Sequence, residues 1–573
     1  MIKISLCCTL LAVSMPAFAQ SDPAFDRARL AKHVQTLSSD AFEGRGPATP
    51  GETKTVAYLS REFAAAGLSP GGDVVNGKRG WTQAVPLLKS SLIGAPVLSI
   101  RTAVGVANMV QGEQIAVRSP MNGQSAIALT NAPLVFAGYG VSAPERGWDD
   151  FKDVDVAGKI IVVLINDPDF EGAPDVAGGK GDFGGEAMTY YGRWTYKFEE
   201  AAKRGAAGVM IVHETEPASY GWETVKNSNT NVMFDIVRAA PGQAHTGFES
   251  WIQRDTAVAV FKAAGLDFEA AKASARRKDF RPVDLKASLD ARATAKTEVI
   301  TSFNVVARLA GTKRPDETVI YTAHHDHLGV GLPDANGDRI FNGAIDNGTG
   351  MSHLLEQARA FARRPRTERS VVFLAVGAEE KGLLGSEYYV ANPLYPLSRT
   401  VGVLNTDSMG VEGPARNFTI SGQAKLGLLD LLVVEGARRG RSYSPDPNVG
   451  AGYFFRSDHF PFAKRGVPAI SFGSGNDLVN GGIARGTALA ADYRAKRYHQ
   501  QDDEYQPGWD LSGMVADASF LHAVGRDLAN STAWPNWSED SEFRSVRDRS
   551  EAERAAPASD PASDPTVTSG ERG

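Results

Sequence analysis

The second half of the chain alternates apolar, strand-like segments with amphipathic helices. From about Thr297 onward the strand-like segments read ETVIYTAHHDH, SVVFLAV, TVGVLNTDS and GVPAISFG. A helix-like segment falls between the first two, with apolar residues at Met351, Leu354, Leu355, Ala358 and Phe361. Continuous apolar runs separated by helices are typical of parallel strands that are covered on both faces. We therefore predict an α/β domain built around a largely parallel mixed sheet flanked by helices.

The chain is too long to be organised by one hydrophobic core. It has 573 residues, whereas single cores stop growing at about 250–300 residues. Between about Ala95 and Lys286 the pattern changes to short strands, such as PLVFAGYG and GKIIVVLIND, separated by loops rich in Gly, Asp and Pro. Few candidate ligands fall in this block. We predict a separate, non-catalytic domain here; the alternative is an elaborated edge of one larger domain.

The N-terminus has the pattern of a secretory signal. MIKISLCCTLLAVSMPAFAQ contains one lysine, an apolar stretch too short to span a bilayer, and the small-x-small sequence Ala17-Phe18-Ala19. We predict a signal peptide over residues 1–19, and thus a periplasmic or secreted protein. Both cysteines of the chain, Cys7 and Cys8, lie inside it. Export without disulfides fits a bacterial periplasm.

The charge of the chain argues against two classes of partner. The formal net charge is −6 and no run rich in Lys or Arg occurs, which argues against nucleic acid or an anionic membrane surface as the main partner. No later apolar run is long enough for a transmembrane helix.

Beyond about Pro535 the chain turns polar and ends in APASDPASDPTVTSGERG. We predict that residues 534–573 form a disordered tail.

Two adjacent glutamates, Glu379 and Glu380, follow the SVVFLAV strand. Like charges beside a core repel each other and resist desolvation unless a cation is near. A solvated turn would explain an isolated pair, but other residues of metal-ligand type also end strands or follow them. They are His324, Asp326, Asp346, Asp407 and His499. Ligands of open α/β sheets collect at the carboxyl ends of strands, and a mixed His/carboxylate set suits zinc or a similar divalent ion.

The spacing within these motifs suggests separate duties. In a strand, His324 and Asp326 share one face while His325 points away. Asp326 can then accept a hydrogen bond from the ring nitrogen of His324 that does not bind metal. By the same alternation we expect Glu379 and Glu380 to diverge, with one binding metal and the other facing the attacking water.

Six motifs resemble, in order, those of a known peptidase family. They are AHHDHLG, NGAIDNGTG, AVGAEEKGLLGS, NTDSMG, RSDHFPFAKRGVPAISFG and YHQQDDEY. The family is that of the co-catalytic zinc aminopeptidases related to bacterial leucyl aminopeptidase and yeast aminopeptidase Y. Residues 96–289 are similar to the β-rich protease-associated domain often inserted in its members. The resemblance implies a zinc-exopeptidase-like catalytic domain in two parts, residues 20–95 and 290–533.

The resemblance also implies the ligands of two zinc ions. Asp346 would bridge the two ions. His324 and Asp407 would complete the first site, and Glu380 and His499 the second. Two dications and three carboxylates would leave a site that one hydroxide neutralises.

Three further residues receive roles from the resemblance. Glu379 would be the general base, and Asp326 would orient His324. Tyr453, which is one residue away from the family's position, would stabilise the oxyanion. We expect His327 to support its loop, and Asp458 to shape the pocket wall. Asp502 and Asp503 would either orient His499 or lie in a solvated loop.

The function indicated by the sequence is therefore that of an exported di-zinc metallopeptidase. An aminopeptidase acting on the N-termini of peptides or proteins is the leading activity. A carboxypeptidase of the same superfamily is an alternative, because Arg456 and Lys464 could hold a terminal carboxylate. A glutaminyl-cyclase-like acyltransferase and a non-catalytic receptor-like relative are the others. Side-chain preference and oligomeric state do not follow from the sequence.

Overall fold

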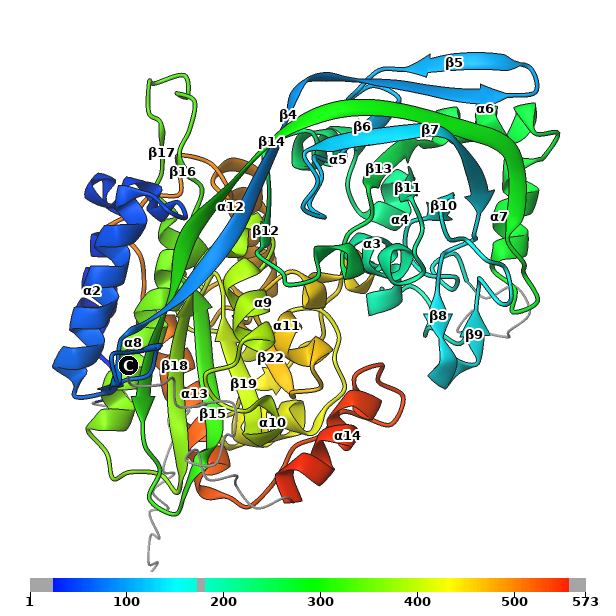
Figure 1. Ribbon diagram of the computed structural model, residues 1–573. Coiled ribbons are helices and arrows are strands. Elements are labelled where there is room, and N and C mark those ends of the chain that lie inside the picture. The colour runs from blue at the N-terminus through cyan, green and yellow to red at the C-terminus, as the bar shows by residue number, and fades with distance from the viewer. Residues whose placement is uncertain (1–23, 173–180, 556–573) are drawn as a thin grey trace, which may run out of the picture.

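The computed structural model describes residues 24–172 and 181–555 (Figure 1). The predicted signal peptide, residues 1–19, lies outside these residues. Among the helices described, none combines the length and the apolarity needed to cross a membrane. The described chain forms two bodies side by side, joined by long strands (Figure 1).

One mixed sheet of 16 strands runs through both bodies. Four neighbouring parallel strands form the centre of the first body. They are β22 (Ala469–Ser474), β19 (Thr400–Thr406), β15 (Arg314–His324) and β18 (Arg369–Val376). Strands β20 (Asn417–Ile420) and β21 (Ser442–Tyr443) continue this end of the sheet. The predicted α/β domain with a largely parallel mixed sheet is confirmed.

Both faces of these strands are buried, which explains their continuous apolar sequences. In β18, Val371 and Phe373 belong to one large core, and Val372 and Leu374 belong to a second core on the opposite face. The first core includes residues of α1 (Arg27–Leu37), α2 (Pro50–Ala66), α8 (Gly350–Ala362), α10 (Gly427–Arg438) and α13 (Ser512–Asn530). The second includes residues of α9 (Leu384–Ala391) and α11 (His459–Lys464). Helices thus cover both faces of the central strands.

The second body, which we call the inserted part, has its own sheet segment and cores. Its parallel strands are β7 (Ala126–Phe136), β10 (Ile160–Leu164), β11 (Gly208–His213) and β13 (Phe248–Gln253), with β6 (Ile115–Val117) antiparallel at the edge. Its helices include α3 (Trp194–Lys203), α5 (Trp222–Asn229), α6 (Arg254–Ala263) and α7 (Phe268–Ala275). The boundaries 96–289 and the resemblance to a protease-associated domain stay predictions.

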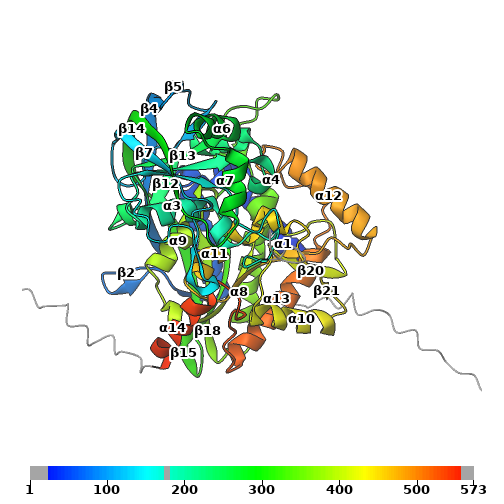
Figure 2. The same cartoon turned by 90° about the vertical axis from the view of Figure 1, so that its right-hand side faces the viewer.

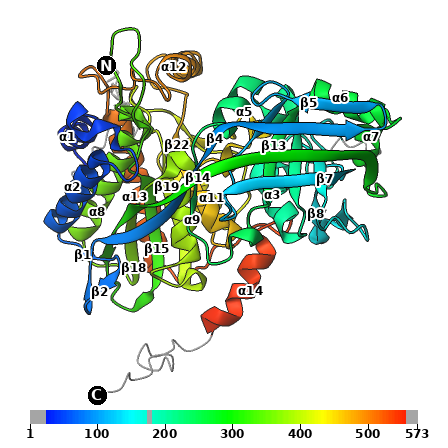
Figure 3. The same cartoon turned by 45° about the horizontal axis from the view of Figure 1, so that its top comes forward.

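Two long strands join the bodies. Strand β4 (Thr82–Thr102) pairs antiparallel with β14 (Val283–Leu309), from Thr82 opposite Val305 to Arg101 opposite Ser288. Figure 3 shows these strands side by side as they pass from one body to the other. The connection is therefore a hydrogen-bonded ribbon with a fixed register, and not a single flexible linker.

The C-terminal segment corrects one prediction. Residues 534–555 are ordered and include helix α14 (Arg544–Ala555), which Figure 2 shows against the first body. Trp537 is buried and its Nε1 donates to the carbonyl of Gly466 (3.0 Å); buried Arg547 donates to the carbonyl of Thr400 (3.1 Å). A few spaced aromatic residues anchor this polar segment, so the prediction of disorder is wrong up to residue 555. The rest of the predicted tail lies outside the described residues.

Candidate metal centre

Three strand ends and two loops bring the five predicted metal ligands together. His324 is the last residue of β15, Glu380 follows β18, Asp407 follows β19, Asp346 lies in the turn before α8, and His499 follows α12 (Gly482–Lys496). The carboxyl ends of parallel strands meet at one edge of a sheet. Their order in the sheet therefore sets which ligands become neighbours.

Asp346 lies between the two histidines. Its Oδ1 is 3.3 Å from Nε2 of His324, and its Oδ2 is 3.2 Å from Nε2 of His499. Each histidine has a second carboxylate partner through the same nitrogen: Asp407 for His324 (3.2 Å) and Glu380 for His499 (3.2 Å). Each oxygen of Asp346 thus serves one of two His/carboxylate groups, which is the arrangement required of a bridging ligand.

A sharp turn places both glutamates at the site. The strand ends at Val376, Ala378 has a left-handed backbone conformation (φ 56°), and Glu379–Lys381 form a helical turn. One oxygen of each glutamate lies within 4.8 Å of the other and of a ring nitrogen of His324. The alternation that we expected does not apply, because the pair lies beyond the strand. Non-glycine residues with positive φ are uncommon and are enriched at functional sites.

Asp326 holds this turn. Its carboxylate accepts hydrogen bonds from the backbone N–H groups of Glu379 (3.0 Å) and Glu380 (3.3 Å). Nδ1 of His324 is 3.2 Å from the backbone oxygen of Asp326 and 3.9 Å from its carboxylate. His324 is therefore oriented mainly by a main-chain carbonyl. His325 points away, with Nε2 2.8 Å from the carbonyl of Phe303.

The electrostatics of the cluster fit a pair of divalent ions. In the described part of the chain, the ion pairs of Asp346, Asp407 and Glu380 involve only histidines. Burial opposes a charge on His499, but Asp346 and Glu380 outweigh it and raise its pKa to about 10. Protons on the histidines thus offset the carboxylates in the chain alone. Metal ions would replace these protons, since histidine binds metal in its neutral form, and the donor set suits zinc.

The surroundings of Glu379 favour the protonated form of its carboxyl group. Burial raises its pKa well above the usual range, and the carboxylates of Glu380, Asp458 and Asp407 add to this effect against the attraction of His324. Asp458 is fully buried, accepts a hydrogen bond from the hydroxyl of Ser386 (2.7 Å), and leaves its Oδ2 without a partner. Burial also raises the pKa of Asp458, to about 7.

Two further residues of the quoted motifs, Asp503 and His327, support candidate ligands through contacts that the motifs themselves do not indicate. Asp503 accepts hydrogen bonds from the backbone N–H groups of Ile345 and Asp346, both 3.0 Å, so it positions the backbone of Asp346 and not His499. His327 places Nδ1 2.7 Å from Glu380. It also forms a group with Asp346 and Glu380 whose ligand atoms lie within 4.8 Å of one another. His327 thus positions a candidate metal ligand.

Arg45 supports the same loops from the N-terminal region. Its side chain is 1% exposed and donates to the carbonyls of His325 (2.9 Å), Leu37 (2.6 Å), Asn342 (2.7 Å) and Gly343 (2.8 Å). These contacts join the loop that follows His324 to the loop that leads into Asp346. Nothing in the sequence around Arg45 marks it as different from a surface arginine.

Tyr453 lies in the turn Tyr453–Phe455, with the guanidinium of Arg456 5.1 Å from the centre of its ring. No hydrogen bond of its hydroxyl occurs among the described residues. Its expected role at the oxyanion stays a prediction.

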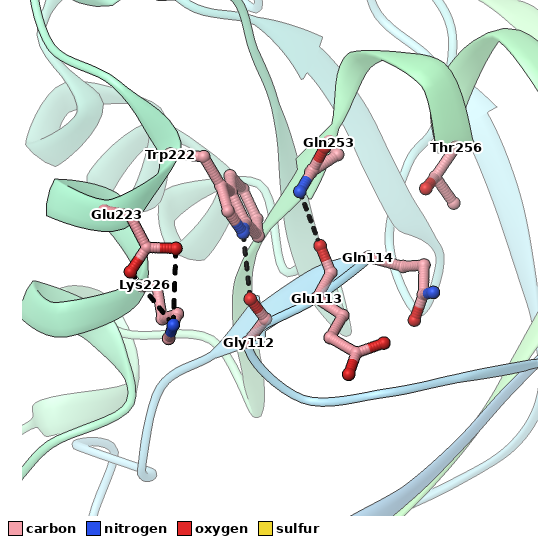
Figure 4. A pocket seen from close by; sticks show the side chains of 8 residues that line it. All are labelled: Gly112, Glu113, Gln114, Trp222, Glu223, Lys226, Gln253 and Thr256. Carbon is pink, nitrogen blue, oxygen red and sulfur yellow. Dashed lines mark hydrogen bonds and ion pairs between the residues drawn. The ribbon is translucent and has the colours of Figure 1, made fainter.

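A separate cavity lies in the inserted part. It has a volume of about 400 Å³ and is lined by eight residues, among them Trp222, Glu223 and Lys226 (Figure 4). Nε1 of Trp222 donates to the carbonyl of Gly112, and Lys226 pairs with Glu223. None of the candidate metal ligands lines it. The cavity is thus not part of the metal centre.

The comparison with protein families identifies the part of the chain that carries this centre. Residues 304–521 match the model of peptidase family M28. This part of the chain is similar to that family, and we call it the M28 part. All five candidate ligands of the M28 part, together with Glu379 and Asp326, fall within the matched residues.

Curated relatives match over the same part. A probable zinc metalloprotease of Leptosphaeria maculans is 30% identical over 205 residues, and aminopeptidase YwaD of Bacillus subtilis is 30% identical over 179 residues. Each match covers 30% of this chain, and they cover 47% and 35% of the relatives. The chain thus spans less than half the length of either. A solved aminopeptidase from Aneurinibacillus sp. strain AM-1 is 19% identical, over 89% of this chain and 95% of that chain, with a TM-score of 0.48.

Proposed function

We propose that the protein is an exported zinc-dependent aminopeptidase that holds two zinc ions. The match of residues 304–521 to the model of peptidase family M28 supports peptide hydrolysis. The observation that carries the proposal is the position of Asp346, with one oxygen 3.3 Å from His324 and the other 3.2 Å from His499. A site for a single ion would need no carboxylate shared in this way.

In this proposal the five ligands divide as the resemblance implies. Asp346 would bridge the two ions, His324 and Asp407 would hold one of them, and Glu380 and His499 would hold the other. When bound, such a pair lowers the pKa of a water molecule and polarises the scissile carbonyl. Asp326 keeps the turn of Glu379 and Glu380 in place, and Asp503 keeps the backbone of Asp346 in place.

Glu379 is proposed to move the proton. Its carboxylate accepts a proton from the attacking water, and the carboxyl group then donates that proton to the leaving amine. A raised pKa suits this double role, because the group must first hold the proton and then release it. The mechanism needs no serine or cysteine nucleophile.

The neighbours of Lys464 bear on the carboxypeptidase alternative. Its Nζ lies 3.0 Å from Glu199 and 2.8 Å from Glu387. Two carboxylates already offset its charge, so Lys464 is a poor candidate for holding a terminal carboxylate. Of the two basic residues considered for a carboxypeptidase, only Arg456 then lacks a carboxylate partner among the described residues.

The test compares peptides with free and acetylated N-termini, using zinc-loaded protein and its Glu379→Gln variant. We expect cleavage of the free peptides only, and a loss of roughly 100- to 10,000-fold in kcat for the variant. Equal cleavage of free and acetylated peptides would overturn the aminopeptidase assignment. An unchanged rate in the variant would overturn the role of Glu379.

A further inference from the structure

Two arginines meet where the inserted part contacts the M28 part, and neither has a carboxylate partner within residues 24–172 and 181–555. Arg193, in the inserted part, directly precedes α3 and is 8% exposed. Among the described residues its guanidinium has no ion pair and no hydrogen bond, and its Nε is enclosed without a partner. A buried charge without a partner is costly and calls for an explanation.

Arg456 comes from the M28 part. Its Nη2 donates to the hydroxyl of Ser219 (2.9 Å) and to the carbonyl of Ala451 (2.6 Å), and its Nε is enclosed without a partner. The ring of Tyr220 in the inserted part lies 6.0 Å from its guanidinium carbon. In the described chain, Arg456 has no ion pair with a carboxylate.

The two cations act on each other. Burial and the charge of Arg456 lower the pKa of Arg193 to about 10, and no carboxylate opposes them. Two other cations at this boundary are paired: Lys464 with Glu199 and Glu387, and Arg146 with Glu542. Arg193 and Arg456 differ from them in having no carboxylate partner among the described residues.

The residue after Arg456 contacts a candidate metal ligand. Ser457, the residue after Arg456, donates its hydroxyl to Oδ2 of Asp407 (2.7 Å). The inserted part is held against the same loop: the N–H of Met188 donates to the carbonyl of Val449 (3.2 Å), and the rings of Tyr190 and Phe460 lie 5.3 Å apart. A ligand bound at the two arginines would therefore reach toward the candidate metal ligands.

We propose that Arg193 and Arg456 form a carboxylate-binding site that receives a carboxylate of the peptide substrate. Guanidinium groups bind carboxylates through paired N–H donors, and the anion supplies the charge that the two arginines lack. The carboxylate comes either from the C-terminus of a short peptide or from an acidic side chain. This inference rests on the proposed peptidase function, and it assigns to the inserted part a direct role in substrate selection.

The test measures peptide binding by calorimetry in the zinc-loaded Glu379→Gln protein, which separates binding from cleavage. One arm compares Leu-Gly-Gly with its C-terminal amide, and a second compares Leu-Glu-amide with Leu-Gln-amide. We expect the carboxylate form to bind about 10- to 100-fold more tightly in at least one arm. The arm that shows the preference identifies the source of the carboxylate.

Substitutions assign the preference to the arginines. Adding Arg193→Met or Arg456→Met should reduce the ratio of affinities to about 1, and Arg193→Lys should restore part of it. Arg146→Gln, at the same boundary, should leave the ratio unchanged. Arg193→Met should also melt no lower than the parent protein, because it removes an unpaired buried charge.

Two outcomes would overturn the proposal: equal binding of acids and amides in both arms, or a preference that both methionine variants retain. Cleavage of Leu-Gly-Gly-amide by the unsubstituted protein reports separately on the peptidase function. Cleavage without any carboxylate preference would contradict only the arginine site. Selective binding without cleavage of any peptide would contradict only the proposed activity.

Discussion

The M28 part and the inserted part each bury a histidine between two carboxylates, but only one of these groups is suited to metal. In the inserted part, His245 places Nδ1 2.9 Å from Glu249 and Nε2 3.0 Å from Asp235. Arg238 pairs with Asp235 (2.6 Å) and Arg118 with Glu249 (3.1 Å). In the M28 part, His324 and His499 share Asp346, and the described residues provide no lysine or arginine in an ion pair with it.

The difference shows what distinguishes a metal centre from an internal ionic network. Around His245 the protein supplies its own cations, so the carboxylates are already neutralised. Around Asp346 the charge balance stays negative unless protons or metal ions enter. Residue types alone do not separate the two cases, whereas the presence of a paired arginine does.

Of the substitutions considered, loss of the proposed base Glu379 should have the largest effect on kcat. The matching substitution in the inserted part should have little effect on kcat. Glu379→Gln should lower kcat by about 1,000-fold, since general-base catalysis contributes roughly 100- to 10,000-fold. Its zinc content, measured by atomic emission, should not change. His245→Gln serves as the comparison and should keep kcat within about twofold. A large loss of kcat in that variant would erase the contrast between the two parts.

His245 should make the stability of the inserted part depend on pH. Burial disfavours the imidazolium, but Glu249 and Asp235 outweigh this and raise its pKa to about 9. The folded protein therefore holds this proton more tightly than the unfolded chain. The resulting stabilisation is complete below pH of about 6.5 and is lost as the pH rises through about 9. It amounts to about 3 kcal/mol.

Urea unfolding at several pH values, followed by hydrogen exchange in β13 and α3, measures this effect. The decline in stability between pH 6.5 and 9 should disappear in His245→Gln. An identical decline in both proteins would show that His245 is not its source.

Much of the fold of the M28 part and much of its candidate metal centre could be predicted from the sequence. The continuous apolar strands predicted a parallel sheet, and the placement of His324, Glu380 and Asp407 at strand ends predicted that they converge. Local patterns could not predict that Asp326 accepts hydrogen bonds from the turn of Glu379 and Glu380, or that Asp503 accepts them from the backbone of Asp346. In both cases a side chain contacts the backbone of a segment that is distant in the sequence. The order of residues 534–555 was missed for a similar reason: Trp537 is anchored by the carbonyl of Gly466.

Substitution of Arg45 tests whether a buried arginine supports the metal centre or only stabilises the fold. Arg45→Gln should weaken zinc binding by about 10- to 100-fold, the usual cost of losing contacts that orient metal ligands. The reason is that the loops of His324 and Asp346 would lose the hydrogen bonds through which Arg45 joins them. Competition with a zinc-binding dye measures the change in affinity.

Arg369→Gln is the matched control. Arg369 is also fully buried, and it donates to the carbonyls of Leu528 (2.8 Å) and Ala533 (3.0 Å), away from the metal ligands. This variant should lose stability but keep its zinc affinity. Equal losses of zinc affinity in the two variants would reduce Arg45 to a general contribution to folding.

The most direct test of the two-ion centre is X-ray diffraction from zinc-loaded crystals at the zinc absorption edge. We expect two anomalous peaks on opposite sides of the Asp346 carboxylate, one next to His324 and Asp407 and the other next to Glu380 and His499. We also expect no peak at His245. A single peak at Asp346, or none there, would contradict the central claim.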